Sequence, residues 1–155
     1  MGKAIEIQAP NSIPLTHDLK VFLGGSIEMG KAINWQKTLI EALADKPILF
    51  LNPRRDDWDS SLIQNINDEQ FRTQVEWELD SMERADIIVM VFDPNTMSPI
   101  SLLELGLHSK SGKLVVMCPE GFWRKGNVDI VCNTYDIPMV ESIEELIQFI
   151  LEDLC

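Results

Sequence analysis

Hydrophobic and polar residues follow two different periods along the chain. Short uninterrupted runs rich in Val, Ile and Leu are typical of strands that are buried on both faces of a sheet. Five such runs predict strands, at residues 19–25, 47–53, 86–94, 113–119 and 137–140. Apolar residues that recur every three or four positions predict helices, at residues 34–45, 69–85, 98–111 and 142–155. Residues 120–136 fit neither period and are expected to be irregular, with room for one helical turn.

The alternation of strands with amphipathic helices predicts an α/β fold, because parallel strands need helical connections, which cover both faces of the sheet. We expect a flavodoxin-like or Rossmann-like three-layer sandwich with a five-stranded parallel sheet. Residues 1–18 are polar and contain two prolines, so they are expected to form an arm before a single domain at residues 19–155. In such folds, ligands bind at the carboxyl ends of the strands.

Composition narrows the classes of partner. The formal net charge of −12 and the pI near 4.4 argue against a nucleic acid or an anionic membrane as partner, because both carry negative charge themselves. The cysteines and histidines lack the spacing of a metal site or a disulfide framework, so we expect neither. The longest apolar run, residues 87–92, is far shorter than the ~20 residues of a membrane span. With no signal region at the N-terminus, a cytoplasmic location is expected.

The stretch SPISLLELGL at residues 98–107 places a carboxylate inside a helix that is expected to be buried. Ser98 is a good N-cap. Helical spacing then puts Ile100, Leu103 and Leu107 on one apolar stripe, which we expect to face the core, with Glu104 beside it. A carboxylate in such a place is either satisfied by partners or used in chemistry.

The predicted helix at residues 69–85 repeats this arrangement. Phe71, Val75 and Met82 share a face by helical spacing, and Glu78 lies at its centre. Each glutamate could instead have a purely structural role: Glu78 could form an ion pair with a nearby arginine, and Glu104 could cap neighbouring backbone. Two carboxylates that converge on one crevice favour glycosidic chemistry, in which one attacks the anomeric carbon and the other handles the proton of the leaving group.

A glycine-rich turn follows the first predicted strand. Gly24, Gly25 and Ser26 form neither a dinucleotide-binding fingerprint nor a P-loop. Two interpretations remain open at this point: the glycines let the backbone approach a ligand closely, or they make a tight turn.

Five segments, in this order, resemble the nucleoside 2-deoxyribosyltransferase family, and the last of them fits its nucleoside 2-deoxyribosyltransferase-like branch. The segments are VFLGGSI (21–27), NPRRDDW (52–58), QVEWEL with the following AD (74–86), SPISLLELG (98–106) and GFWRKGNVDIVC (121–132). The resemblance covers most of residues 20–140, and its most diagnostic element is the Glu-Leu-Gly at residues 104–106.

The resemblance implies cleavage and transfer of the N-glycosidic bond of 2′-deoxyribonucleosides. Glu104 would be the nucleophile that attacks C1′, expels the base and forms a covalent deoxyribosyl ester. Glu78 matches a family aspartate that contacts the base and helps to move its proton, and here it is one methylene longer. No metal and no organic cofactor are implied, since the ester performs the activation.

The resemblance also implies substrate-binding residues. Ser98 stands where well-studied transferases carry an aspartate that binds sugar hydroxyls, and where deoxynucleoside monophosphate N-glycosidases carry a serine that contacts the 5′-phosphate; its alternative role is helix capping. Asn52, Arg54 and Trp58 are expected to line the pocket, as are Gly24, Gly25 and Ser26. Two alternatives to the transferase stay open: a hydrolase of deoxynucleoside 5′-monophosphates, and a nucleotide-binding module without turnover.

Asn127 and Asp129 match a family segment that reaches the active site of a neighbouring subunit, so we expect a homo-oligomer. The adjacent Phe122 and Trp123 are expected to be interface anchors, a wall for the base, or ordinary core. The sequence does not select the preferred base.

Overall fold

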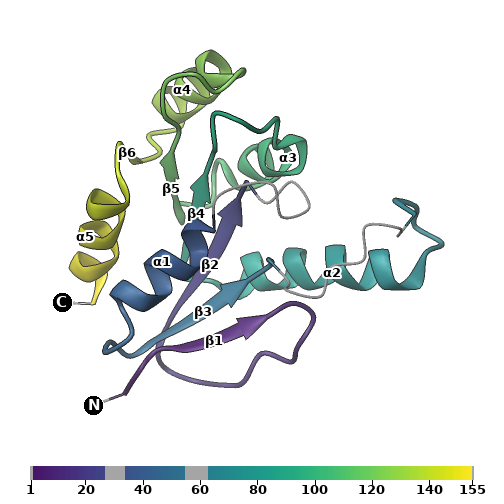
Figure 1. The fold of residues 1–155 in the computed structure, drawn as a ribbon, viewed down its shortest axis with the longest axis vertical. Helices are drawn as coiled ribbons and strands as arrows, with labels where there is room; N and C mark the ends of the chain where they lie inside the picture. Colours follow the sequence, from purple (N-terminus) through teal and green to yellow (C-terminus); the bar gives the residue numbers. More distant parts are fainter. Residues whose placement is uncertain (1, 27–33, 55–62, 155) are drawn as a thin grey trace.

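A computed structural model describes residues 2–26, 34–54 and 63–154 of the 155-residue chain. Its centre is a parallel sheet of six strands in the order β1-β3-β2-β4-β5-β6 (Figure 1). The strands are β1 (Ile5–Gln8), β2 (Leu19–Gly25), β3 (Ile48–Asn52), β4 (Ile87–Val91), β5 (Leu114–Met117) and β6 (Met139–Val140). The helices in the described part of the chain are α1 (Trp35–Ala42), α2 (Glu69–Arg84), α3 (Pro99–His108), α4 (Lys125–Thr134) and α5 (Ile143–Asp153).

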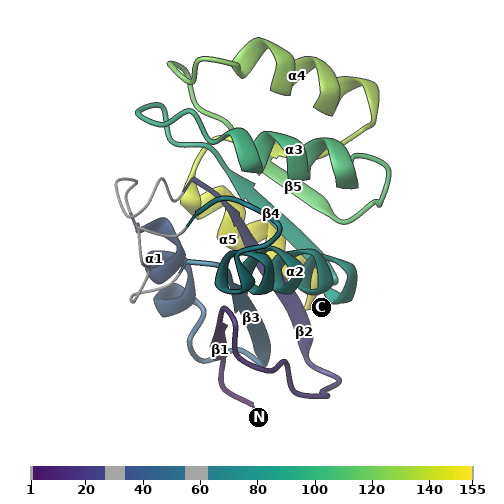
Figure 2. The same cartoon turned by 90° about the vertical axis from the view of Figure 1, so that its right-hand side faces the viewer.

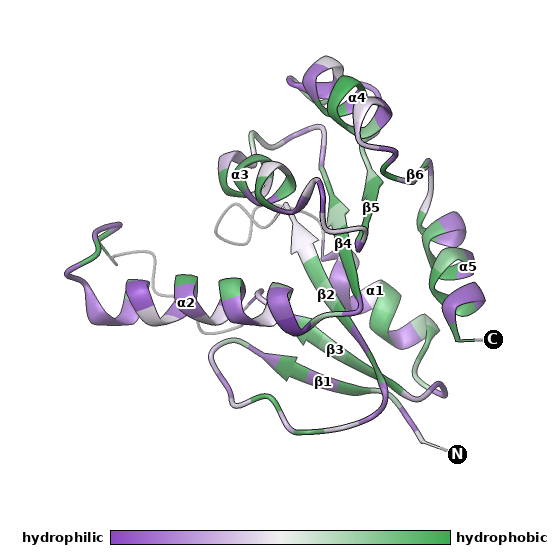
Figure 3. Ribbon diagram, turned by 180° about the vertical axis from the view of Figure 1, so that it is seen from behind, coloured by the Kyte–Doolittle hydropathy of each residue, from purple (hydrophilic) through white to green (hydrophobic). Residues whose placement is uncertain are grey.

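Helices cover both faces of the sheet, which confirms the three-layer α/β class. Figure 2 shows α2, α3 and α4 side by side over one face. Their buried side chains, such as Trp77, Leu105 and Val128, form one core with residues from that face of the strands. Helices α1 and α5 pack with Leu39 and Leu146 into a second core on the other face. Strand β4 is hydrophobic throughout (Figure 3), and β3 is hydrophobic up to its last residue, because neither face of these strands meets solvent.

The sheet has six strands rather than the five that we predict from the sequence. The additional strand, β1, lies within residues 1–18, and it pairs in parallel with β3 at the edge of the sheet. Its sequence, IEIQ, alternates apolar with polar residues, and its side chains are exposed or only partly buried. A short edge strand of this kind lacks the continuous apolar run by which the other strands are recognised.

The segment at residues 120–136, expected to be irregular, contains helix α4. Val128 and Cys132 are its buried residues, and Lys125 pairs with Asp129 one turn along the helix. Gly126 and Asn127 in its first turn are weak helix formers, so local propensity does not predict this helix. Packing of its buried residues stabilises it.

Helix α3 faces the core with the side opposite to the one predicted. Ile100, Leu103 and Leu107 are 58%, 66% and 59% exposed, whereas Glu104 is only 7% exposed. Apolar periodicity identifies the apolar stripe of a helix, but it does not tell whether that stripe meets the core or a surface. The prediction for α2 is also partly wrong, because Val75, expected on its buried face, is exposed at the surface.

Candidate active site

Two carboxyl groups meet between neighbouring helices. Glu78 in the middle of α2 and Glu104 in the second half of α3 share a side-chain hydrogen bond. Asp68 fixes the start of α2, since its Oδ1 accepts a hydrogen bond from the backbone N–H of Phe71 at 3.1 Å. Arg84, which could have been a partner of Glu78, pairs instead with Asp80 at 3.1 Å, within α2.

The environment of this pair favours the neutral form of a carboxyl group. Burial raises the pKa of Glu104 to about 9, and the adjacent charge of Glu78 adds to the rise. Burial raises the pKa of Glu78 as well. A hydrogen bond between two carboxyl groups needs a proton, and two adjacent charges out of water repel each other, so the pair holds at least one proton near neutral pH and titrates as a unit.

Gln74 is a third member of the site, and sequence analysis missed it. It lies one helical turn before Glu78, and its Nε2 donates hydrogen bonds to Oε2 of Glu78 at 2.9 Å and to the backbone oxygen of Pro53 at 3.1 Å. The sequence signal available was the spacing of four residues on one helix, which is weak by itself. Through Pro53, Gln74 links the carboxyl pair to the carboxyl end of β3.

The glycines at the end of β2 are required by the packing of two strands. A Cβ atom on Gly25 would lie 2.1 Å from the backbone oxygen of Val91 in β4, and the φ angle of Gly25 is +130°. A Cβ on Gly24 would lie 3.0 Å from the backbone oxygen of Val89. The close approach that these glycines permit in the structure is therefore that of β2 to β4.

Three hydroxyl groups form a buried cluster just beyond the ends of β2 and β4. Oγ of Ser26 lies 2.9 Å from Oγ1 of Thr96 and 2.6 Å from Oγ of Ser98, and the last two oxygens are 2.8 Å apart. The backbone N–H of Asp93 donates to Oγ of Ser26 at 2.7 Å. The structure thus brings Ser26 and Ser98 together, and it adds Thr96, which neither periodicity nor the resemblance indicated.

Ser98 holds the N-cap position of α3 without the capping hydrogen bond expected of it. Its φ of +47° is in the left-handed region, which a non-glycine residue rarely adopts. Its hydroxyl instead forms hydrogen bonds with the hydroxyl groups of Ser26 and Thr96. Backbone strain of this kind is often found at functional sites, where surrounding contacts hold it.

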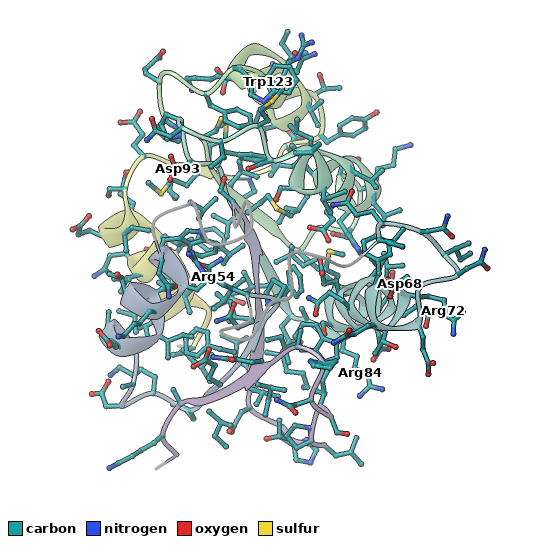
Figure 4. The ribbon with its side chains drawn as sticks, turned by 45° about the vertical axis from the view of Figure 1, so that its right-hand side comes forward. Arg54, Asp68, Arg72, Arg84, Asp93 and Trp123 are labelled. Carbon is teal, nitrogen blue, oxygen red and sulfur yellow. The ribbon has the colours of Figure 1, made fainter. Side chains whose placement is uncertain are left out.

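The residues expected from the end of β3 are directed toward other elements. Nδ2 of Asn52 donates to Oε2 of Glu6 in β1 at 2.8 Å, and the guanidinium of Arg54 donates to Oε1 of Gln36 in α1 at 3.4 Å. Figure 4 shows Arg54 close to α1. Trp58 lies outside the described residues. The segment is linked to the carboxyl pair indirectly, because the Pro53 oxygen accepts a hydrogen bond from Gln74, which also donates to Glu78.

The residues expected to reach a neighbouring subunit lie across α3 from Glu104. Asn127 is exposed and lines a cleft of about 300 Å³ between α3 and α4, whose other lining residues are Leu102, Leu105, Gly106, Arg124, Val128 and Val131. Asp129 pairs with Nζ of Lys125 at 3.1 Å. Because Glu104 faces α2 while the cleft faces α4, the structure does not bring Asn127 or Asp129 to the carboxyl pair of the same chain.

The two neighbouring aromatic residues differ in exposure. Phe122 is buried against Phe92, with ring centroids 4.8 Å apart, and is therefore core. Trp123 is half exposed near the outer end of α4 (Figure 4), where its Nε1 donates to the backbone oxygen of Met97 at 2.8 Å. The guanidinium of Arg124 lies 4.5 Å from the Trp123 ring centroid.

Within the described part of the chain, no three candidate metal ligands come together, and no helix is long and apolar enough to span a membrane. The fold and the carboxyl pair define a Rossmann-like α/β protein with groups suited to nucleophilic and acid–base chemistry.

A sequence model of the family described as nucleoside 2-deoxyribosyltransferase-like matches residues 18–122, and the chain belongs to this family. A conserved protein from Enterococcus faecalis V583, known from a crystal structure, shares the fold, with a TM-score of 0.62 and 16% sequence identity over 88% of this chain and 99% of that chain. No protein of curated function matches the chain.

Proposed function

We propose that the protein cleaves and transfers the N-glycosidic bond of 2′-deoxyribonucleosides through a covalent deoxyribosyl intermediate on Glu104. The observation that carries this proposal is the hydrogen-bonded pair of Glu104, which is buried, and Glu78, which is partly buried, in a chain of the nucleoside 2-deoxyribosyltransferase-like family. Glycosidic chemistry needs a nucleophile and a proton donor close together, and a carboxyl pair with one shared proton supplies both.

The reaction follows from the protonation of the pair. Glu104, as a carboxylate, attacks C1′ while the bond from C1′ to the base nitrogen breaks, and the electron pair of that bond leaves with the base. The proton of the pair passes through Glu78 to the departing base. A second base then attacks C1′, expels Glu104 as a carboxylate and returns its own proton to Glu78.

Product analysis tests this function directly. The protein is incubated with deoxynucleosides and with deoxynucleoside 5′-monophosphates, with and without a second free base, and the products are separated by chromatography. A new deoxynucleoside that forms only with the second base supports transfer. Free deoxyribose, or deoxyribose 5-phosphate from a monophosphate, as the main product with and without the second base supports a hydrolase instead. No base release from any deoxynucleoside or monophosphate supports the non-catalytic module.

The hydroxyl cluster keeps the 5′-monophosphate hydrolase as the second candidate, because serine at position 98 puts no carboxylate where it would repel a phosphate. We still expect free deoxynucleosides to be the better substrates. The Ser98 hydroxyl already bonds to Ser26 and Thr96, Arg54 donates to Gln36, and a net charge of −12 gives no general attraction for phosphate.

Turnover of deoxyguanosine and deoxyadenosine is therefore expected to exceed that of their 5′-monophosphates, and Ser98→Asp is expected to lower monophosphate turnover further. The matched control is Ser142→Asp at the N-cap of α5, where aspartate caps as well as serine. If the monophosphates are turned over at least about tenfold faster and Ser98→Asp reverses that order, the hydrolase replaces the transferase.

A homo-oligomer is the assembly that we propose, with the outer face of α3 as its interface. This face consists of Ile100, Leu103 and Leu107, and Met97 lies just before the helix; each of the four is more than half exposed. A standard interface buries roughly 800 Å² on each partner, with apolar side chains at its centre. A second copy suits this face because Asn127 and Asp129 do not reach the carboxyl pair of their own chain and would act only on a neighbour's pair.

Leu103→Glu is expected to shift the protein from at least a dimer to a monomer, because it places a charge at the centre of the interface. Light scattering at micromolar concentration measures the mass. The control is Leu15→Glu, since Leu15 is almost fully exposed and lies outside α3. A monomeric parent protein, or equal masses for the parent and Leu103→Glu, would contradict the assignment.

A further inference from the structure

The side chain of Gln74 is almost completely buried, and both of its N–H donors are used. One goes to the backbone oxygen of Pro53, which can only accept, so the nitrogen of the amide must face this side. The other goes to Oε2 of Glu78 at 2.9 Å. Oε2 is therefore an acceptor, and the shared proton of the carboxyl pair lies on the side of Glu78 that meets Glu104, or on Glu104 itself.

The Gln74 hydrogen bond acts on one carboxyl group and not on the other. A hydrogen bond to an ionised carboxylate is stronger than one to a neutral carboxyl oxygen, so Gln74 favours the ionised form of Glu78. In a pair with a single proton, this preference moves the proton toward Glu104. The pKa directions agree: burial raises both, and Gln74 opposes the rise at Glu78.

Apart from Glu104, whose own hydrogen bond also lowers the pKa of Glu78, charges in the described part of the chain do not account for this bias. Among the described residues, Glu104 on α3 is the titratable group that shifts the pKa of Glu78. From the end of β3 the contact is the neutral Pro53 oxygen, while the Arg54 guanidinium donates to Gln36 on α1. The charged residues Arg72, Glu76, Asp80 and Arg84 of α2 pair with each other along the exposed side of that helix.

We propose that Gln74 is a positioning residue, which sets where the shared proton of the Glu78–Glu104 pair resides before substrate binds and which ties Glu78 to the carboxyl end of β3. Its catalytic meaning rests on the proposed function. The proton must pass from Glu104 to Glu78 before the attack, because Glu104 attacks as a carboxylate and the departing base needs the proton. The position of the proton, however, is a property of the protein alone.

Carbon-13 NMR of the glutamate carboxyl carbons measures that position by pH titration, with Glu78→Gln and Glu104→Gln used for assignment. In the parent protein, Glu78 is expected to report the lower apparent pKa of the pair. Gln74→Met keeps the length of the side chain and removes both donors, so the lower apparent pKa is expected to rise by about one unit. The Glu104 carbon is then expected to take part in that step. Gln70→Met, at an exposed position one turn earlier on α2, is the control and is expected to change neither carbon.

A titration of the pair that is the same in Gln74→Met and the parent, with the fold intact by circular dichroism, would overturn the proposal. If Gln74→Met does not fold, Gln74→Asn withdraws the amide by one methylene and is expected to shift the titration in the same direction; an unchanged titration there has the same meaning. The readout needs no substrate. If the titration shifts in Gln74→Met but the parent protein releases no base, the proposed function is refuted and the role of Gln74 is supported. If the parent protein is active but the titration does not shift, the role of Gln74 is refuted and the proposed function is unaffected.

Discussion

Glu104→Gln is expected to lower the rate of base release by at least about 10⁴-fold, because the loss of a covalent nucleophile removes the main reaction path. The fold is expected to remain intact. Glutamine keeps the volume of the side chain and removes a buried group whose ionisation is unfavourable, so the unfolding temperature should not fall. Initial rates from chromatography, together with thermal unfolding, measure both effects.

Glu76→Gln is the matched control for this substitution. Glu76 is exposed on α2 and lies 3.9 Å from the guanidinium of Arg72, an arrangement that contributes little to stability. We expect the control to release base at the parent rate. Base release by Glu104→Gln within about tenfold of the parent would contradict the assignment of Glu104 as nucleophile.

Glu78→Gln is expected to lower base release by roughly 10²- to 10⁴-fold, which is the usual contribution of a positioned proton donor. An amide cannot pass a proton to the base. The loss should therefore be large for a purine, which leaves as a neutral base only if it is protonated, and small for a deoxyriboside with an acidic leaving group that departs as an anion. The ratio of kcat/KM values for the two substrates is the measurement.

Glu78→Asp serves as the control, because it keeps a carboxyl group and restores the residue found at this position in the transferases that the chain resembles. It is expected to retain more activity than Glu78→Gln, with the larger gain on the purine substrate. Equal losses for both leaving groups in Glu78→Gln would argue that Glu78 only shapes the site and does not move the proton.

The layers of the fold could be predicted from the sequence because most strands are buried on both faces. Strands β3 and β4 are fully buried, and such strands need continuous apolar runs whatever surrounds them. Strand β1 escaped prediction because an edge strand with polar side chains has no such requirement. Helix α4 escaped because packing of Val128 and Cys132, and not local propensity, stabilises it.

The orientation of α3 could not be predicted from its apolar stripe. A stripe of Ile100, Leu103 and Leu107 is compatible with burial in a core or with an exposed face, and the choice depends on the partners of the opposite side. Here the opposite side carries Glu104, whose partner Glu78 comes from another helix. Long-range pairing of two carboxyl groups leaves no trace in the periodicity of either helix.

The supporting residues of the site were harder to find than the carboxyl groups. Gln74 and Thr96 act through hydrogen bonds to groups from other segments, namely Pro53 for the first and Ser26 for the second. Such contacts depend on the tertiary arrangement of the chain, so a motif cannot reveal them. Conversely, the position of Asn52 and Arg54 at or near the end of a strand could be predicted from the sequence. Their hydrogen bonds to residues of β1 and α1 could not.

Mass spectrometry of the covalent intermediate tests the central claim most directly. The protein is mixed with a deoxynucleoside in the absence of an acceptor base, quenched with acid, digested and analysed for a peptide that carries one added deoxyribosyl group. We predict that this group is found on Glu104 in the parent protein and is absent from Glu104→Gln. Release of the base at the parent rate by Glu104→Gln, or a deoxyribosyl group attached to a different residue, would contradict the account.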